Sequence, residues 1–257
     1  MHPVLLKFGS FTIYTYGFFV FLGVLFGYFF CLKQAIRENI NKGVFSDIIF
    51  WTLIFSFLGA RFFYILTDFE NFLLNPLEVL LSRSGFVFYG GVVFGVVALY
   101  VLARLHKMNF FKLSDIIVSG VPLAHAFGRL GCFSQGCCYG RETDSFIGVL
   151  FPKDSPAGFA GVRVIPTQLI EAVSLFLLFA ALIILKKKKK FDGQILAFYL
   201  IFYSIIRFII EFFRGDPRGS ILFLSFSQSI SVILMAFGIF LYFWLGLRAA
   251  QKRNKII

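Results

Sequence analysis

The stretch FTIYTYGFFVFLGVLFGYFFCL, residues 11–32, decides the fold of this chain. It carries no charged side chain, and a bilayer core about 30 Å thick is spanned by about 20 apolar residues in a helix. The apolar run is longer than that of a usual signal peptide, and no small-residue cleavage site precedes Lys33. We therefore expect this stretch to form a membrane helix that stays in the mature protein.

Further windows of similar length recur along the chain. They cover residues 44–66, 86–105, 113–133, 166–185, 194–213 and 226–247. The composition agrees, because 59% of the 257 residues are hydrophobic and only 15% are charged. The sequence predicts an all-α, polytopic membrane protein with seven transmembrane helices, forming a single integral-membrane domain over residues 1–257.

The basic residues are distributed unevenly between the predicted loops. When the loops are assigned alternately to two sides, one side holds 15 of the 25 lysines and arginines and the other holds 7. Cytoplasmic loops are the ones enriched in Lys and Arg. We therefore expect the N-terminus outside, the C-terminus in the cytoplasm and the loop 134–165 on the extracytoplasmic side. The net charge of +12 then reflects orientation and lipid anchoring, with no nucleic-acid partner.

Two arginines lie inside apolar windows, Arg129 in LAHAFGRLGCF and Arg207 in FYSIIRFIIEFF. A guanidinium at membrane depth costs roughly 2.5–3.5 kcal/mol on insertion scales, so each needs an anionic partner. Glu211 is four residues from Arg207 and shares its helix face, and Arg214 continues that face outward. A structural ion pair between Arg207 and Glu211 is the simpler interpretation of this spacing.

The arginines nevertheless outnumber the carboxylate assigned to them. Glu211 alone cannot neutralise Arg129, Arg207 and Arg214, so the sequence predicts excess positive charge in one outward-opening cavity. The planar fork of arginine binds phosphate through two parallel hydrogen bonds. We therefore expect an anionic ligand, and the phosphate of a lipid is the obvious candidate.

The segment GRLGCFSQGCCYGR, residues 128–141, is rich in glycine and cysteine. Its four glycines predict that the segment is not a regular helix throughout and contains an unwound or re-entrant stretch. An oxidising exterior permits a disulfide between Cys132 and either Cys137 or Cys138, which is the favoured role of these thiols. A redox-active pair, which would make the chain a membrane thiol oxidoreductase, is the alternative. A metal site is disfavoured because the paired C-x-x-C spacing of zinc sites is missing.

Several segments share their order and spacing with a known family. They are IYTYGF (13–18), GARFFY (59–64), FVFYGG (86–91), SD (114–115), GRLG (128–131), PTQLIEA (166–172) and YSIIRFIIEFFRGD (203–216). In these segments the chain resembles the prolipoprotein diacylglyceryl transferases, which are bacterial enzymes with seven spans. The resemblance runs nearly from end to end.

The resemblance implies a reaction, its substrates and its place. Phosphatidylglycerol would give its diacylglyceryl group to the lipobox cysteine in the signal peptide of a lipoprotein precursor. A thioether would form and glycerol phosphate would leave. The resemblance also implies an enzyme without a cofactor or a metal, multi-pass in the bacterial cytoplasmic (inner) membrane, with its active site on the extracytoplasmic side.

The resemblance also assigns residues to this reaction. Arg129 and Arg207 match the essential arginines of the family and would stabilise the phosphate leaving group as its charge develops. Arg214 is expected to join them in binding substrate, because it lies beyond Glu211 on the same stretch. The family positions that shape the lipid site fall on Tyr16, Tyr203, Gly140 and Glu211.

The chain departs from the family at the residue expected to remove the thiol proton. The family's His-Gly-Gly reads Tyr89-Gly90-Gly91 here. A free phenol ionises only near pH 10, about three units above neutrality, so it needs neighbouring positive charge to act as a base. We expect Tyr89 to occupy the position of the base, and His125, one turn before Arg129, is the alternative.

Three further departures fall in the glycine-rich segment, where two asparagines and a glutamate of the family are replaced. The replacements are Cys132, Gln135 and Cys137. They leave open a second interpretation, in which the chain is a paralogue with an altered lipid or thiol substrate, or without activity. A transporter is disfavoured because no internal repeat is evident.

Overall fold

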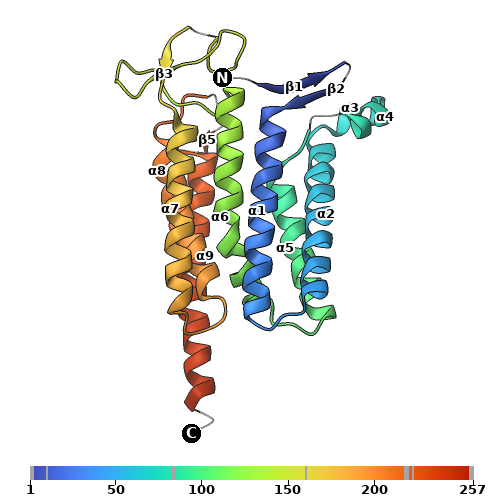
Figure 1. The fold of residues 1–257 in the computed structure, drawn as a ribbon, viewed down its shortest axis with the longest axis vertical. Coiled ribbons are helices and arrows are strands. Elements are labelled where there is room, and N and C mark those ends of the chain that lie inside the picture. Colours follow the sequence, from blue (N-terminus) through green and yellow to red (C-terminus); the bar gives the residue numbers. More distant parts are fainter. Residues whose placement is uncertain are drawn as a thin grey trace. The chain divides into compact units, whose positions relative to one another are not determined.

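The computed structural model describes residues 3–9, 11–82, 85–159, 161–216, 220–221 and 223–254. Within these residues, seven helices are long and apolar enough to cross a membrane (Figure 1). They are α1 (Thr15–Arg37), α2 (Lys42–Thr67), α5 (Phe88–Leu105), α6 (Phe110–Gln135), α7 (Thr167–Lys187), α8 (Gln194–Glu211) and α9 (Phe226–Asn254). The prediction of an all-α membrane protein with seven spans is confirmed.

Two predicted boundaries differ from the structure. Residues Phe11–Tyr14 form strand β2, which pairs with β1 (Val4–Phe8) in an antiparallel hairpin before α1. The glycine-rich segment 128–141 is not a regular helix throughout, as predicted, but its first half is helical, because α6 continues to Gln135 and the left-handed turn comes at Gly136, with φ of 72°. Gly131 instead permits close packing, since a Cβ there would lie 3.1 Å from the Tyr16 ring.

The chain forms two compact units. The first comprises Met1–Cys31 and Ser114–Ile257, and the second comprises Leu32–Leu113. In the second unit α2 packs against α5, and the short helices α3 (Phe69–Leu74) and α4 (Pro76–Leu81) come between them in the chain. A Cβ at Gly59 would lie 2.7 Å from the carbonyl oxygen of Gly90, so this contact requires glycine. The single domain over residues 1–257 stays a prediction.

Arg61, a third arginine inside a predicted span, has a structural role in the second unit. Its guanidinium donates hydrogen bonds to the carbonyl oxygens of Gly85 at 2.9 Å and Ser82 at 3.1 Å, and to that of Val79. Backbone carbonyls at the end of α4 therefore satisfy this charge, which leaves Arg129 and Arg207 as the intramembrane arginines of interest.

In the first unit, the core lies between α6, α7 and α8. Its buried cluster consists of Ala126, Leu175, Leu178, Leu182 and Ile195. Helix α9 packs on α8, and α1 approaches α6 where a Cβ at Gly23 would lie 2.6 Å from the carbonyl oxygen of Ala124. These contacts bring the polar faces of α6, α7 and α8 together.

The connection between α6 and α7 is an ordered layer with its own apolar cluster. It contains the antiparallel pair β3 (Val149–Leu150) and β4 (Arg163–Val164), and Phe151, Ala157 and Val164 are buried in it. Figure 1 shows this layer at the end of the unit where α6 ends and α7 begins. A further pair, β5 (Ser220–Ile221) and β6 (Leu224–Ser225), precedes α9.

At the N-terminal end of α8, a carboxylate from α6 caps the helix. Asp115 is fully buried and accepts hydrogen bonds from the backbone N–H groups of Gly193 and Leu196, both at 2.8 Å. Lys189 lies 3.1 Å from Asp115 and 2.8 Å from Asp192. Burial acts to lower the pKa of Lys189, but the bond to Asp192 and the charge of Asp115 outweigh it and raise the pKa. Lys189 is therefore held by two carboxylates.

Candidate active site

Glu171 on α7 joins the two intramembrane arginines. Its side chain is fully buried, and its Oε1 lies 2.9 Å from Nη2 of Arg129 on α6. Its other oxygen, Oε2, lies 3.7 Å from Nη1 of Arg207 on α8. The guanidinium groups of α6 and α8 thus face the same carboxylate, as expected for arginines that share one site.

Arg207 has a second carboxylate on its own helix. Its Nη2 lies 2.7 Å from Oε2 of Glu211, which is the ion pair that the four-residue spacing predicted. The same Nη2 donates a hydrogen bond to Oγ of Ser227 at 3.1 Å, and Oγ of Ser225 donates one to Oε1 of Glu211 at 2.9 Å. Ser225 lies on β6 and Ser227 in the first turn of α9. The network therefore draws its side chains from α6, α7, α8 and α9 and from β6.

These contacts correct the charge count made from the sequence. Glu171 is a second carboxylate between Arg129 and Arg207, and Arg214 binds Asp216 through two hydrogen bonds of 2.7 and 2.8 Å. The three arginines therefore face three carboxylates, and the predicted excess of positive charge is wrong. The sequence argument failed because it counted only the carboxylate close to Arg207 in the chain.

The arginines nevertheless retain unused hydrogen-bond donors. Among the residues that the structure describes, Nε of Arg129 and Nη1 of Arg207 are buried and have no hydrogen-bond acceptor. An unpaired buried donor costs about 1–3 kcal/mol, more for a charged group. The site is thus neutral in formal charge, yet each of the two arginines keeps one buried donor without a hydrogen bond.

Arg214 and Gly140 lie together just beyond the end of α8. Helix α8 ends at Glu211, so Arg214 is not on the helix face where the sequence placed it, and its peptide bridges to that of Gly140. A Cβ at Gly140 would lie 2.6 Å from the carbonyl oxygen of Ile165, which only glycine avoids. Burial acts to lower the pKa of Arg214, but the hydrogen bond to Asp216 outweighs it and raises the pKa.

His125 and Tyr203 border the network on the side of the core. The Nε2 atom of His125 lies 4.0 Å from Oε1 of Glu171, and its ring lies 5.6 Å from that of Tyr203. Tyr16, on the first turn of α1, lies against Gly131 of α6 and is 44% exposed. All three therefore belong to the same unit as the arginines.

Tyr89, the expected base, belongs to the second unit. It lies on the first turn of α5, is 38% exposed and contacts the ring of Phe88 with centroids 5.6 Å apart. Its placement near the arginines stays a prediction.

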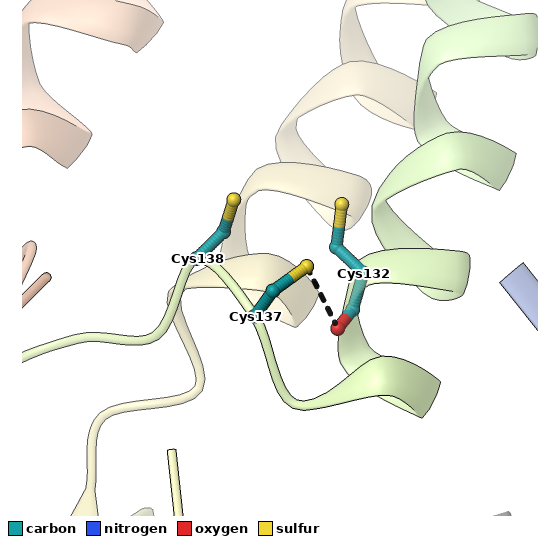
Figure 2. Close-up of side chains that lie close together, drawn as sticks. All are labelled: Cys132, Cys137 and Cys138. Atoms are coloured by element: carbon teal, nitrogen blue, oxygen red, sulfur yellow. Dashed lines mark hydrogen bonds between the residues drawn. The ribbon is translucent and has the colours of Figure 1, made fainter. Parts of the chain in front are cut away.

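The three cysteines of the glycine-rich segment converge. Cys132 lies in the last turn of α6, and Cys137 and Cys138 follow the turn at Gly136; all three Sγ atoms lie within 4.8 Å of one another (Figure 2). They are free thiols, so the favoured disulfide is not formed in this structure. Hydrogen bonds from the neighbouring thiols lower the pKa of Cys138, and the charge of Arg214 acts in the same direction.

The unit that holds the network also contains two cavities. One, of about 360 Å³, is lined by the outer layer, including Tyr139, Gly140 and Arg141. The other, of about 300 Å³, lies between α7 and α8 and is lined almost wholly by apolar side chains, namely Ile147, Ile165, Ile170, Ser174, Ile206, Ile209, Ile210 and Phe213. The arginines line neither of these cavities, although Ile206 and Ile210 flank Arg207 on α8.

Sequence reasoning missed Glu171 as a member of the site. The residue lies in the quoted segment PTQLIEA, but no role was assigned to it. The signal was present, because Glu171 is an ionisable residue inside an apolar window, the same feature that singled out Arg129 and Arg207.

The fold and the site together define a multi-pass membrane protein with a network of arginine and glutamate buried among its helices. A sequence model of the family described as prolipoprotein diacylglyceryl transferase matches residues 3–244. The chain therefore belongs to the prolipoprotein diacylglyceryl transferase family, and its enzymatic class is that of a transferase.

Individual relatives agree with this assignment. The chain is 38% identical over 243 residues to phosphatidylglycerol–prolipoprotein diacylglyceryl transferase 2 of Clostridium perfringens, covering 94% of each chain. It is 35% identical over 242 residues to the phosphatidylglycerol–prolipoprotein diacylglyceryl transferase of Clostridium tetani, covering 94% of this chain and 97% of the relative. The enzyme of that name from Rickettsia bellii is 32% identical over 259 residues, covering 98% of each. The resemblance stated from the motifs is confirmed.

Proposed function

We propose that this chain transfers the diacylglyceryl group of phosphatidylglycerol to the lipobox cysteine thiol of lipoprotein precursors. The sulfur attacks the glyceryl carbon that carries the phosphate, a carbon–sulfur bond forms, and the carbon–oxygen bond breaks. Glycerol phosphate leaves with the electron pair of that bond. Family membership and the names of the relatives support both substrates.

One observation carries the proposal, namely the two buried arginines that converge on Glu171 with unused donors. Nε of Arg129 and Nη1 of Arg207 are available to the phosphate oxygens, on which negative charge grows as the carbon–oxygen bond breaks. Donors fixed in advance in a site of low dielectric are worth more than donors in water. Glu171 and Glu211 hold the guanidinium groups in place for this role.

The surrounding residues complete the lipid site in this proposal. The apolar cavity between α7 and α8 takes part of an acyl chain, because it lies beside Arg207 and is almost free of polar groups. Tyr16 and Tyr203 border the headgroup, and Arg214 contributes positive charge at its outer edge. Gly140 acts through its backbone, by allowing the outer layer to pack against the end of α8.

The test is a transfer assay with the purified protein. It uses phosphatidylglycerol vesicles and a lipobox peptide, and it follows glycerol phosphate release and the mass of the peptide. We expect the peptide to gain one diacylglyceryl group. A peptide with serine in place of cysteine, and vesicles of phosphatidylcholine alone, serve as controls. Failure of transfer by folded protein, with oxidation of thiols instead, would favour the alternative of a thiol oxidoreductase.

The site is proposed to face the extracytoplasmic side of the bacterial inner membrane. The excess of lysine and arginine on the opposite loops supports this orientation. We expect a fluorescent protein fused after α9 to fluoresce, and alkaline phosphatase inserted in the loop between β3 and β4 to be active. If alkaline phosphatase fused at the C-terminus were active instead, the protein would have the opposite orientation.

Tyr89 is proposed to accept the thiol proton, by its match to the family position of the base. Tyr89→Phe should lower the transfer rate by about 10²-fold or more, since general bases contribute 10²–10⁴-fold, and Tyr89→His should retain activity. Tyr100→Phe, an exposed tyrosine on the same helix, is the matched control. An unchanged rate for Tyr89→Phe would place the base elsewhere, with His125 the next residue to replace.

A further inference from the structure

The three sulfurs of Cys132, Cys137 and Cys138 have the geometry of a metal site. A tetrahedral zinc ion with Zn–S bonds of about 2.3 Å holds its sulfurs about 3.8 Å apart. The three Sγ atoms already lie within 4.8 Å of one another, so shifts of less than about 1 Å would bring them to bonding positions. Figure 2 shows the three sulfurs on the same side of the segment, with that of Cys137 between and below those of Cys132 and Cys138.

The backbone around these thiols is held from several directions. The carbonyl oxygen of Cys137 accepts a hydrogen bond from Nε2 of Gln168 at 2.7 Å, and that of Cys138 accepts one from Oγ1 of Thr167 at 2.9 Å. Cys138 has a φ of 63°, a left-handed conformation that costs energy in a residue other than glycine. The first turn of α7 thus holds the backbone of Cys137 and Cys138 in a strained loop next to Cys132.

The fold removes the objection that the sequence raised against a metal. The C-x-x-C spacing brings two thiols together within one short turn, and this chain lacks it. Here the end of α6 and the left-handed turn at Gly136 bring Cys137 back toward Cys132, with the Cys137 N–H bonded to the Cys132 carbonyl at 3.2 Å. The spacing between Cys132 and Cys137 is longer than in C-x-x-C, but the fold still brings the two thiols together.

The chemistry of the donors selects the ion. Three soft thiolates favour zinc or a similar thiophilic ion over magnesium or calcium. Arg214, whose peptide bridges to that of Gly140, is held beside the loop that carries Cys138. Three protein ligands leave the fourth tetrahedral position open, which is the pattern of catalytic rather than structural zinc sites.

We propose that Cys132, Cys137 and Cys138 bind one zinc-type ion whose open position takes the thiol of the acceptor peptide. This second part rests on the proposed transferase function. A thiol that coordinates zinc is deprotonated, so its proton leaves to solvent. The bound sulfur then forms the bond to the glyceryl carbon, glycerol phosphate leaves, and nothing is oxidised or reduced.

The position of the thiols fits this role. Cys132 follows Arg129 by three residues on α6, which corresponds to a rise of about 4.5 Å along the helix. An acceptor sulfur bound beside Cys132 would therefore lie within about one helical turn of the donors proposed to hold the phosphate. The attacking sulfur and the leaving group would be held by neighbouring parts of one helix.

The first experiment measures metal binding without reference to activity. Reduced, metal-free protein is titrated with Co²⁺, whose sulfur charge-transfer and tetrahedral d–d absorption bands report thiolate ligands, and Zn²⁺ is then used to displace it. We expect one equivalent of Co²⁺ to bind to the unsubstituted protein. The Cys31→Ala variant should bind the same amount, because the Cys31 thiol donates to the carbonyl oxygen of Ile116 and is not one of the three clustered cysteines. Serine at any one of the three positions should weaken binding by at least about tenfold. Binding that survives these substitutions, or no binding at all, overturns the metal site.

A second measurement does not depend on the serine variants folding. In the Cys31→Ala protein, one equivalent of Zn²⁺ should protect all three remaining thiols from alkylation by N-ethylmaleimide. Unchanged alkylation of any of the three would exclude that thiol from the site and overturn the three-thiolate proposal.

The last experiment separates the metal site from the transferase function. A lipobox peptide added to the Co²⁺ protein should strengthen the charge-transfer band by adding a fourth sulfur, whereas the serine peptide should not. An unchanged spectrum overturns the role of the open position. Transfer of diacylglyceryl at full rate by the metal-free protein would also overturn the role of the open position, but it would leave the proposed transferase function intact. A peptide-dependent spectrum without any transfer supports the site and contradicts the proposed function.

Discussion

Replacing Arg207 with lysine is expected to lower kcat/KM for diacylglyceryl transfer by about 10²- to 10³-fold, the range seen when one fixed donor to a developing anion is lost. In the structure the guanidinium contacts Glu211 with Nη2 and faces Glu171 with Nη1. A lysine ammonium is a single point charge and cannot hold both carboxylates while also donating to a phosphate. Initial rates of glycerol phosphate release measure the effect.

Two comparisons make this result specific. Arg129→Lys should show a similar loss, because its guanidinium faces the same carboxylate, whereas Arg104→Lys, at the exposed end of α5, should leave the rate unchanged. Thermal unfolding of each variant shows whether the fold is retained. A folded Arg207→Lys protein with a rate close to that of the unsubstituted enzyme would contradict the proposed role in stabilising the leaving group.

Replacing Glu171 with glutamine is expected to destabilise the protein by about 3–5 kcal/mol, the range found when one partner of a buried ion pair is removed. The carboxylate is fully buried between Arg129 and Arg207, so its loss leaves uncompensated positive charge among the helices. This corresponds to a fall in Tm of roughly 10 °C for a chain of this length. The measurement is thermal unfolding in detergent without added phosphatidylglycerol.

The pair itself can be tested by removing both partners. Glu171→Leu combined with Arg129→Met should recover much of the stability lost by Glu171→Gln, because apolar side chains of similar size replace a buried pair at little cost. Glu70→Gln, an exposed carboxylate on α3, is the matched control and should not shift Tm. A Tm for Glu171→Gln equal to that of the control would show that Glu171 does not hold the arginines.

Much of the architecture followed from the sequence, because the signals are local. A span of about 20 apolar residues satisfies its backbone as a helix wherever it lies in the bilayer, so the windows matched the helices closely. The spacing of Arg207 and Glu211 likewise predicted their ion pair, since residues four apart share a helix face. The order of the motifs identified the family. The first window was partly wrong, because the apolar alternation of Phe11–Tyr14 suits a strand pairing with Val4–Phe8.

The sequence by itself thus determined the seven spans, the family and the two arginines that need partners. Only the tertiary structure decided that Glu171 is the partner shared by Arg129 and Arg207, because this contact joins side chains on three different helices. The sequence predicted a disulfide from Cys132 to one of its two neighbours, whereas the structure brings all three together as free thiols, because their convergence depends on where α6 ends and on how α7 holds the following loop. Spacing along a chain fixes contacts within one helix, whereas contacts between helices depend on how their faces pack.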